Sequence, residues 1–322
     1  MRFSLVLLAV SAFAQSFSPI AGTGVAGFSG DNGPGLKAQI NNPYGLVIGP
    51  DGALYFCEIG SHRIRRLDLK TGTISTAVGD HEKLNEPYEV RFDSTGNMFF
   101  ADMQEHAIRR VDAKTHAMTT VAGTGVAGFS GDGGPAIQAQ FRQPHSIAFD
   151  PQGRLLICDI GNNRIRRLDL KTGIIQTWGG TGERAAVADG TPIASAPLNE
   201  PRAIAVAPNG DMFLVLRRGN AAYRIDGKTE RIYHVAGTGE TGYTGDGGPA
   251  KTAKLAGPKG ISVAPDGSLY LADTENHAIR RIDSAGVITT VLANLKRPHG
   301  IFVAADGKVY VADSENHRIL VR

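Results

Sequence analysis

The stretch PKGISVAPDGSLYLADTENHAIRRID, residues 258–283, contains the pattern that decides the fold. Apolar and polar residues alternate along 260–263, an Asp-Gly pair follows, and a second apolar run ends at Asp273. The alternation is typical of a half-buried strand, and Asp-Gly is typical of a hairpin turn because glycine readily adopts a positive φ. A third strand is expected over 278–283 and a fourth over 287–292. The stretch therefore predicts one small antiparallel sheet.

This pattern occurs six times along the chain. The copies align without a gap, each begins with proline, and they cover residues 43–68, 87–112, 144–169, 201–226, 258–283 and 298–322. Repeats of this length are units that bury their apolar faces against their neighbours. Six short sheets with no long helix predict an all-β fold, a six-bladed β-propeller of four-stranded antiparallel blades.

The beginning of the chain supplies a candidate for the strand that the last copy lacks. The sixth copy ends at Arg322, inside its third strand. PIAGTG at 19–24 matches TVAGTG at 120–125, which lies on a predicted fourth strand. We expect the N-terminal strand to complete blade six and close the ring, which removes an exposed sheet edge.

Composition and the first residues bear on location and partners. Residues 1–14, MRFSLVLLAVSAFA, have a basic start, a short apolar run and an A-x-A ending, which predict a cleaved signal peptide. A buried first strand is the alternative. We expect residues 15–322 to form one secreted or periplasmic domain, monomeric and without membrane insertion. Lys+Arg 34 against Asp+Glu 31 is too balanced to favour a nucleic-acid partner.

The motifs resemble those of a known repeat family. Asn276-His277 and Asn316-His317 stand before Ala-Ile and Arg-Ile, with Pro-x-Gly-Ile and Asp-Gly-x-Leu-Tyr-x-Ala-Asp upstream. In these features the chain resembles the NHL-repeat family over residues 17–322. The resemblance implies a propeller, but it leaves function open, because such propellers include enzymes, RNA binders and protein-binding ectodomains.

Residues that recur in nearly every copy are expected to serve the scaffold. They are the acids that end strand two (Glu58, Asp102, Asp159, Asp273, Asp313) and the His or Asn residues before strand three (His62, His106, Asn163, Asn220, His277, His317). One member of each Arg pair on strand three is expected to pair with acids between blades. Cys57 and Cys158 lie on different blades at positions filled elsewhere by alanine, so we expect two buried free thiols.

Residues that vary between copies are candidates for ligand binding. The position after each starting proline is expected near the central channel, and it carries Tyr44, Tyr88, His145, Arg202, Lys259 and His299. Blade four has Leu216 in place of the strand-two acid, followed by Arg217 and Arg218. This composition suits an anionic or polar ligand, and we expect Arg202, Arg217 and Arg218 to contact it. The alternatives are side chains that only plug the channel, and drift in one repeat.

Two short segments bear on metal binding. PHSI at 144–147 and PHGI at 298–301 resemble segments of peptidylglycine amidating lyases, six-bladed enzymes that bind zinc through channel histidines. The resemblance implies His145 and His299 as candidate metal ligands. That family uses three histidines from alternate blades, whereas only two occur here. We predict no cofactor and leave zinc or calcium open.

Glycine-rich loops precede blades one, three and five. Near-identical copies span 21–35, 122–136 and 236–250, and a degenerate copy spans 180–197 before blade four. They are not dinucleotide fingerprints, because no βαβ unit surrounds them. Each offers one acid (Asp31, Asp132, Asp246), too few for a tight calcium site. Phe28, Phe129 and Tyr243 are expected to pin the loops.

Taken together, the residues favour an exported binding scaffold over a catalyst. The expected ligand is a peptide, protein or polysaccharide fragment of anionic character, bound at the channel mouth. The alternative is a lyase or lactonase that uses the same mouth, with or without a metal.

Overall fold

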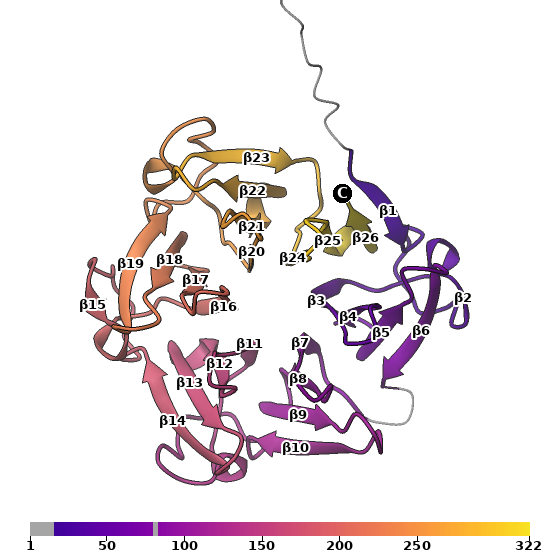
Figure 1. The fold of residues 1–322 in the computed structure, drawn as a ribbon, viewed down its shortest axis with the longest axis horizontal. Helices are drawn as coiled ribbons and strands as arrows, with labels where there is room; N and C mark the ends of the chain where they lie inside the picture. The colour runs from indigo at the N-terminus through magenta and orange to yellow at the C-terminus, as the bar shows by residue number, and fades with distance from the viewer. Residues whose placement is uncertain (1–15, 80–82) are drawn as a thin grey trace, which may run out of the picture.

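The computed structural model describes residues 16–79 and 83–322, and it shows six antiparallel sheets arranged radially around a common centre (Figure 1). The predicted signal peptide, residues 1–14, lies outside the described residues. None of the helical segments in the described chain has the length and apolar character that crossing a membrane requires. The predicted all-β, six-bladed propeller is confirmed.

Each blade runs from its innermost strand outward. Blade one comprises β3 (Pro43–Ile48), β4 (Leu54–Glu58), β5 (Arg63–Leu67) and β6 (Thr73–Val78). Blade two comprises β7 (Pro87–Phe92), β8 (Met98–Asp102), β9 (Ala107–Val111) and β10 (Met118–Ala122). Blade three comprises β11 (Pro144–Phe149), β12 (Leu155–Asp159), β13 (Arg164–Asp169) and β14 (Ile174–Gly179). Blade four comprises β16 (Pro201–Val206), β17 (Met212–Leu216), β18 (Ala221–Ile225) and β19 (Arg231–Ala236). Blade five comprises β20 (Gly260–Val263), β21 (Leu269–Asp273), β22 (Ala278–Ile282) and β23 (Ile288–Leu292). Blade six comprises β24 (Gly300–Val303), β25 (Val309–Asp313), β26 (Arg318–Val321) and β1 (Ser18–Ala21).

The loops between blades add short elements. Two-residue strands extend blades one and four to five strands: β2 (Gly33–Pro34) and β15 (Thr191–Pro192). Single 3-10 turns follow in the glycine-rich loops: η1 (Gly35–Lys37), η2 (Ala136–Gln138), η4 (Ile193–Ser195) and η5 (Ala250–Thr252). Further 3-10 turns join strands two and three: η3 (Ile160–Asn162), η6 (Thr274–Asn276) and η7 (Ser314–Asn316). We call the glycine-rich loops before blades one, three, four and five the leading loops.

The ring closes as predicted. β1 pairs antiparallel with β26, with Ser18 opposite Val321 and Ala21 opposite Ile319 (Figure 1). The first described strand therefore forms the outer edge of the last blade. This pairing ties the two ends of the propeller together and leaves no open edge between blades six and one.

Apolar side chains fill the spaces between neighbouring sheets. One cluster, for example, joins Cys57 and Ile64 of blade one to Val90, Met98 and Phe100 of blade two. Such face-to-face packing requires an apolar residue at every second position, which is the alternation seen in the sequence.

The two cysteines lie in this packing. Cys57 and Cys158 are buried and free, as predicted, and burial raises the pKa of each thiol. A buried thiol with a raised pKa is a poor nucleophile, so both residues act as small apolar groups.

A hydrogen bond between neighbouring blades recurs at all six junctions, and we call it the inter-blade clasp. The His or Asn before strand three has a positive φ and accepts a bond from the backbone N–H of the residue before the next starting proline. The pairs are His62 with Glu86, His106 with Gln143, Asn163 with Glu200, Asn220 with Gly257, His277 with Arg297, and His317 with Asn42, at 2.9 to 3.2 Å. His and Asn tolerate this conformation better than most residues, and both supply an acceptor atom.

The recurring acids are structural, as expected. Each accepts a hydrogen bond from the backbone N–H that lies 17 residues earlier in its own blade, at Asn41, Asn85, Arg142, Ala256 and Lys296. Burial raises the pKa of Glu58 to about 7 and that of Asp159 to about 6.

The expectation that strand-three arginines pair between blades holds in blade three, where Arg167 pairs with Glu230 of blade four at 3.1 Å, and is wrong for the buried arginines. Arg65, Arg166 and Arg280 are fully buried, and each pairs with the strand-two acid of its own blade and with an acid of that blade's leading loop. Asp31, Asp132 and Asp246 therefore serve as partners of guanidinium groups. Each leading-loop acid lies far from its arginine along the chain and outside the aligned copies. Comparison of the copies therefore did not reveal this pairing.

The clasp at the closure seam gives a direct stability test. Replacing His317 with Ala removes the acceptor for Asn42 and leaves alanine at a positive φ, so we expect a loss of about 2–3 kcal/mol of unfolding free energy. His317→Asn should cost less than about 1 kcal/mol, because asparagine makes this bond at two other junctions. Urea unfolding of both variants measures the difference. Equal losses would show that the side-chain acceptor does not hold the seam.

Candidate ligand-binding site at the channel mouth

The residues after the starting prolines converge on one basin. The basin has a volume of about 240 Å³ and lies where the innermost strands begin. Seven of the eight predicted site residues line it: Tyr44, Tyr88, His145, Arg202, Arg217, Lys259 and His299. Arg218 does not. The six-fold arrangement brings these residues together, because six of them follow the prolines at the start of the six repeat copies, and Arg217 follows the second strand of blade four.

Aromatic rings form one side of this basin. Tyr44 stacks on His299 with ring centroids 3.9 Å apart, and its edge meets Tyr88 at 4.7 Å. Tyr88 in turn contacts His145 at 4.3 Å. The Tyr88 hydroxyl is buried and has no hydrogen-bond partner among the described residues. The rings thus fix one another and leave a polar atom available to a ligand.

Both histidines are neutral at physiological pH. His145 Nδ1 lies 2.6 Å from the carbonyl oxygen of Gln143, and His299 Nδ1 lies 2.8 Å from that of Arg297. Since a carbonyl only accepts, each Nδ1 donates and each neutral ring keeps its lone pair on Nε2. Burial lowers the pKa of His145 to about 3, and burial together with the charge of Lys259 lowers that of His299.

Two buried cations face these rings. Lys259 Nζ lies 2.9 Å from Glu275 Oε1 and 3.1 Å from His299 Nε2, and burial lowers its pKa to about 8. Arg202 is only 5% exposed, and its guanidinium lies over the Tyr88 ring at 4.4 Å. In residues 16–79 and 83–322 no carboxylate forms an ion pair with Arg202, and its Nε has no hydrogen-bond partner. Burial lowers its pKa to about 9. A buried guanidinium without a counter-charge is costly, and a bound anion would relieve that cost.

The two arginines of blade four do not both reach the basin. Glu200 accepts from Arg217 at 3.3 Å and from Arg218 at 2.9 Å, so one carboxylate pairs with both. Arg217 reaches the basin, whereas Arg218 is 63% exposed at its side chain and lines another cavity beside blade four. The structure thus brings Arg217 to Arg202 but places Arg218 elsewhere.

Residues before the starting prolines also line the basin, and our sequence reasoning missed them. They are Glu86, Gln143 and Arg297, all with positive φ. Arg297 is bound to Glu275 and Glu315, so its charge is already compensated. Their fixed position immediately before each starting proline was the signal that could have identified them.

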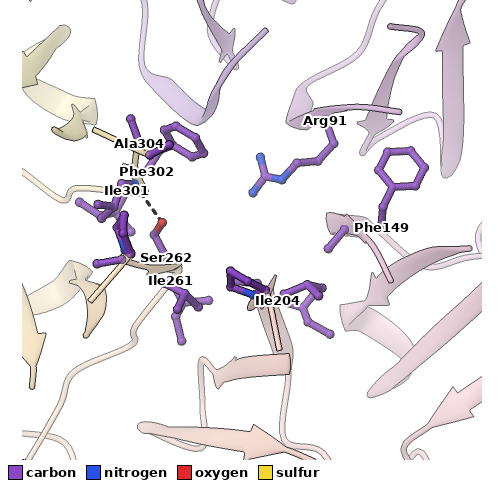
Figure 2. Close-up of a pocket in the computed structure, with 17 residues that line it drawn as sticks. Arg91, Phe149, Ile204, Ile261, Ser262, Ile301, Phe302 and Ala304 are labelled. Carbon is purple, nitrogen blue, oxygen red and sulfur yellow. Dashed lines mark hydrogen bonds between the residues drawn. The ribbon is translucent and has the colours of Figure 1, made fainter. Parts of the chain in front are cut away.

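The far end of the channel has a different character. Beside Glu89 the channel holds only a small cavity of about 10 Å³. Beyond it lies a larger cavity of about 500 Å³. Ile204, Ile261 and Ile301 line this cavity, and Arg91 extends into it (Figure 2). Arg91 is paired with Glu89 at 2.5 Å. The constriction separates the two mouths, and of the two only the basin contains a buried, unpaired cation among the described residues.

The two candidate metal ligands, His145 and His299, have no third ligand beside them among the described residues. Across residues 16–79 and 83–322, no three His, Cys, Asp or Glu side chains are grouped closely enough to hold a metal ion. His299 Nε2 already faces the Lys259 ammonium, and a cation is a poor neighbour for a metal-binding nitrogen.

Sequence comparisons identify the repeats. A family model described as NHL repeat matches residues 141–168 and 295–321, and one described as Teneurin NHL domain matches 225–294. The chain is 24% identical to human NHL repeat-containing protein 2 over 87% of its length, and 26% identical to mouse teneurin-1 over 83%. It is 30% identical over 44% of its length to the Arabidopsis thaliana protein SUPPRESSOR OF QUENCHING 1, chloroplastic. The chain spans only 36%, 9% and 14% of these three relatives, respectively.

Structural comparisons agree on the fold. An auxiliary nutrient binding protein from Bacteroides thetaiotaomicron matches with a TM-score of 0.71 at 18% identity, over 95% of this chain and 75% of that one. An inactive virginiamycin B lyase from Staphylococcus aureus with quinupristin matches with a TM-score of 0.57 at 18% identity, over 88% and 96%. At these identities the likeness shows the fold alone, and these matches do not show the similarity to peptidylglycine amidating lyases. The chain thus contains NHL repeats at residues 141–168 and 295–321 and folds as a six-bladed β-propeller.

Proposed function

We propose that this protein is a binding scaffold that holds an anionic ligand, a carboxylate or a phosphate, in the basin at the channel mouth. The observation that carries this proposal is the buried Arg202 guanidinium without a carboxylate partner. A ligand anion would supply the missing counter-charge and restore hydrogen bonds to a group already removed from water.

Neighbouring groups support the same ligand chemistry. Lys259 adds a second buried cation, and the unpartnered Tyr88 hydroxyl can donate a hydrogen bond to an oxyanion. The stacked rings of Tyr44 and His299 offer an apolar wall to the rest of the ligand. Six side chains held by six different blades form a preformed site, which reduces the ordering cost of binding.

Acid–base catalysis receives less support. A general base works best when its pKa lies near the operating pH, and the pKa of His145 is about 3. The pKa of Lys259 is about 8, but its ammonium group is held by Glu275 at 2.9 Å and by His299 Nε2 at 3.1 Å. The signal-like residues 1–14, together with the likeness to a nutrient binding protein from Bacteroides thetaiotaomicron, support an exported binding protein.

Replacing Arg202 tests the ligand class. We expect citrate, triglutamate or trigalacturonate to raise the melting temperature of the wild-type protein, and Arg202→Met to weaken the affinity by about 100-fold. Thermal shift and titration calorimetry measure both effects. Arg281→Met is the control, because Arg281 pairs with Asp266 outside the basin. Unchanged affinity in Arg202→Met, or no response of the wild type to any of these anions, would contradict the proposal.

Lys259 gives the ligand-free basin a characteristic pH dependence. Its pKa is about 8 in the folded protein against 10.5 ordinarily, so unfolding takes up a proton between these values and stability rises with pH across this interval. The gain is on the order of 2–3 kcal/mol. Lys259→Met should remove it, with Glu275 still held by Arg297. Urea unfolding of both proteins at pH 7.5 and 10 measures this difference in stability. An equal change in stability with pH in the two proteins would contradict a lowered pKa of Lys259.

A further inference from the structure

A second cavity lies beside blade four, away from the channel mouth. Its volume is about 810 Å³, and its lining includes Ala186, Val187 and Asp189 of the leading loop together with Tyr223 and His234 of the blade. None of these residues lines the basin. The leading loop of blade five adds Gly237, Thr238, Gly239 and Lys251, so the cavity lies between blade four and that loop, and the other blades offer a comparison.

The leading loop of blade four begins and ends like its counterpart before blade three. The two loops align without a gap at a spacing of 57 residues. Gly180 N–H bonds to Ile193 at 3.0 Å, as Gly123 bonds to Ala136 at 2.9 Å. The 3-10 turns η2 and η4 occupy the same place in each loop. The two ends of the loop frame are therefore the same. Its middle differs, because Gly131 has a positive φ and its counterpart Ala188 does not, and the described residues of the blade-four loop show no counterpart of the Ala127–Phe141 bridge.

In blade three an aromatic ring and two guanidinium groups occupy this frame. The Phe129 ring lies under the guanidinium of Arg164 at 4.0 Å and that of Arg166 at 5.0 Å. Arg166 is also paired with Asp132 at 2.7 Å. Blade one repeats this arrangement with Phe28, and blade five places Tyr243 against Arg280.

Blade four has lost each of these groups. At the corresponding positions Ala186 replaces Phe129, Ala221 replaces Arg164, and Tyr223 replaces Arg166. Two large side chains become alanine, and both alanines line the cavity. The cavity therefore lies beside the positions that carry an aromatic ring and its guanidinium partner in blade three.

Asp189 is the counterpart of Asp132, but it has no guanidinium partner. Its carboxylate accepts from the His234 backbone N–H at 2.5 Å and lies 3.5 Å from Lys251 Nζ, an exposed pair that contributes little. Half of its side chain is exposed. The rim of the cavity thus carries an acceptor that in three other blades binds a donor.

We propose that this cavity binds an aromatic ring that carries a hydrogen-bond donor. The ring occupies the place of Phe129 in the blade-three frame, against Tyr223 and Val187, and its donor reaches Asp189. The volume falls within the range of small-molecule sites. The ring can come from a free phenolic compound or from a tyrosine side chain of a peptide, and the test separates the two sources.

Titration with matched probes tests this site. We expect 4-methylphenol or N-acetyl-L-tyrosinamide to bind with a dissociation constant below about 10 mM, and N-acetyl-L-leucinamide to bind at least about tenfold more weakly. Tighter binding of the phenol assigns a free compound, and tighter binding of the amide assigns a peptide. Calorimetry measures binding, and fluorescence of Trp178 gives a second readout, since this sole tryptophan packs in the same cluster as Val187 and Tyr223.

Variants separate this site from the channel mouth. Ala186→Phe restores the blade-three ring and should abolish probe binding, whereas Ala194→Phe adds a ring to the same loop outside the cavity and should not. Asp189→Asn should weaken binding about fivefold by loss of the charged acceptor. Arg202→Met should leave aryl binding intact, so failure of the channel-mouth proposal does not affect this one. Unchanged binding in Ala186→Phe, equal binding of the leucine probe, or no aryl binding would overturn the inference.

Discussion

The inter-blade clasp is the interaction on which the rest of the structure depends. It fixes the backbone N–H before each starting proline to the preceding blade, from His317 to Asn42 at the seam as at the other five junctions. The proline then restricts its own φ, so the next residue enters the channel mouth in a defined direction. A repeated backbone contact thereby positions six different side chains around one basin. The scaffold is uniform, and the chemistry at its centre is free to vary.

Much of this arrangement could be predicted from the sequence. Periodicity gave the strands, the copies gave the number of blades, and the match between 19–24 and 120–125 identified the closing strand. The position after each starting proline led to six of the seven predicted residues that line the basin, because position in a repeat translates directly into position around the channel.

Contacts between side chains that lie far apart in the sequence could not be predicted from their positions in the repeat. Glu200 pairs with both Arg217 and Arg218, and only the folded geometry shows which carboxylate each arginine meets. Likewise, the leading-loop acids lie 34 residues from the arginines that they pair with. Both the sequence and the structure were needed to recognise the cavity beside blade four. The sequence shows alanine at positions 186 and 221, and only the structure shows that both line one cavity.

The two proposed sites share one physical origin. At each, groups that would stabilise the fold are missing: a carboxylate for Arg202 at the mouth, and a ring with its guanidinium partners in blade four. Binding sites commonly carry such local costs, because a surface that is fully satisfied internally offers nothing to a ligand. Departures from the repeat therefore mark the places where free energy remains available for binding.

The most direct test of this account is a proteolysis-based stability scan of all single substitutions in the ligand-free protein. The account predicts that alanine lowers stability at the six clasp residues, whereas apolar substitutions of Arg202 and Lys259 leave stability unchanged or raise it. If Arg202 and Lys259 proved as intolerant as the clasp residues, they would belong to the scaffold, and the distinction between repeated and unrepeated positions would fail.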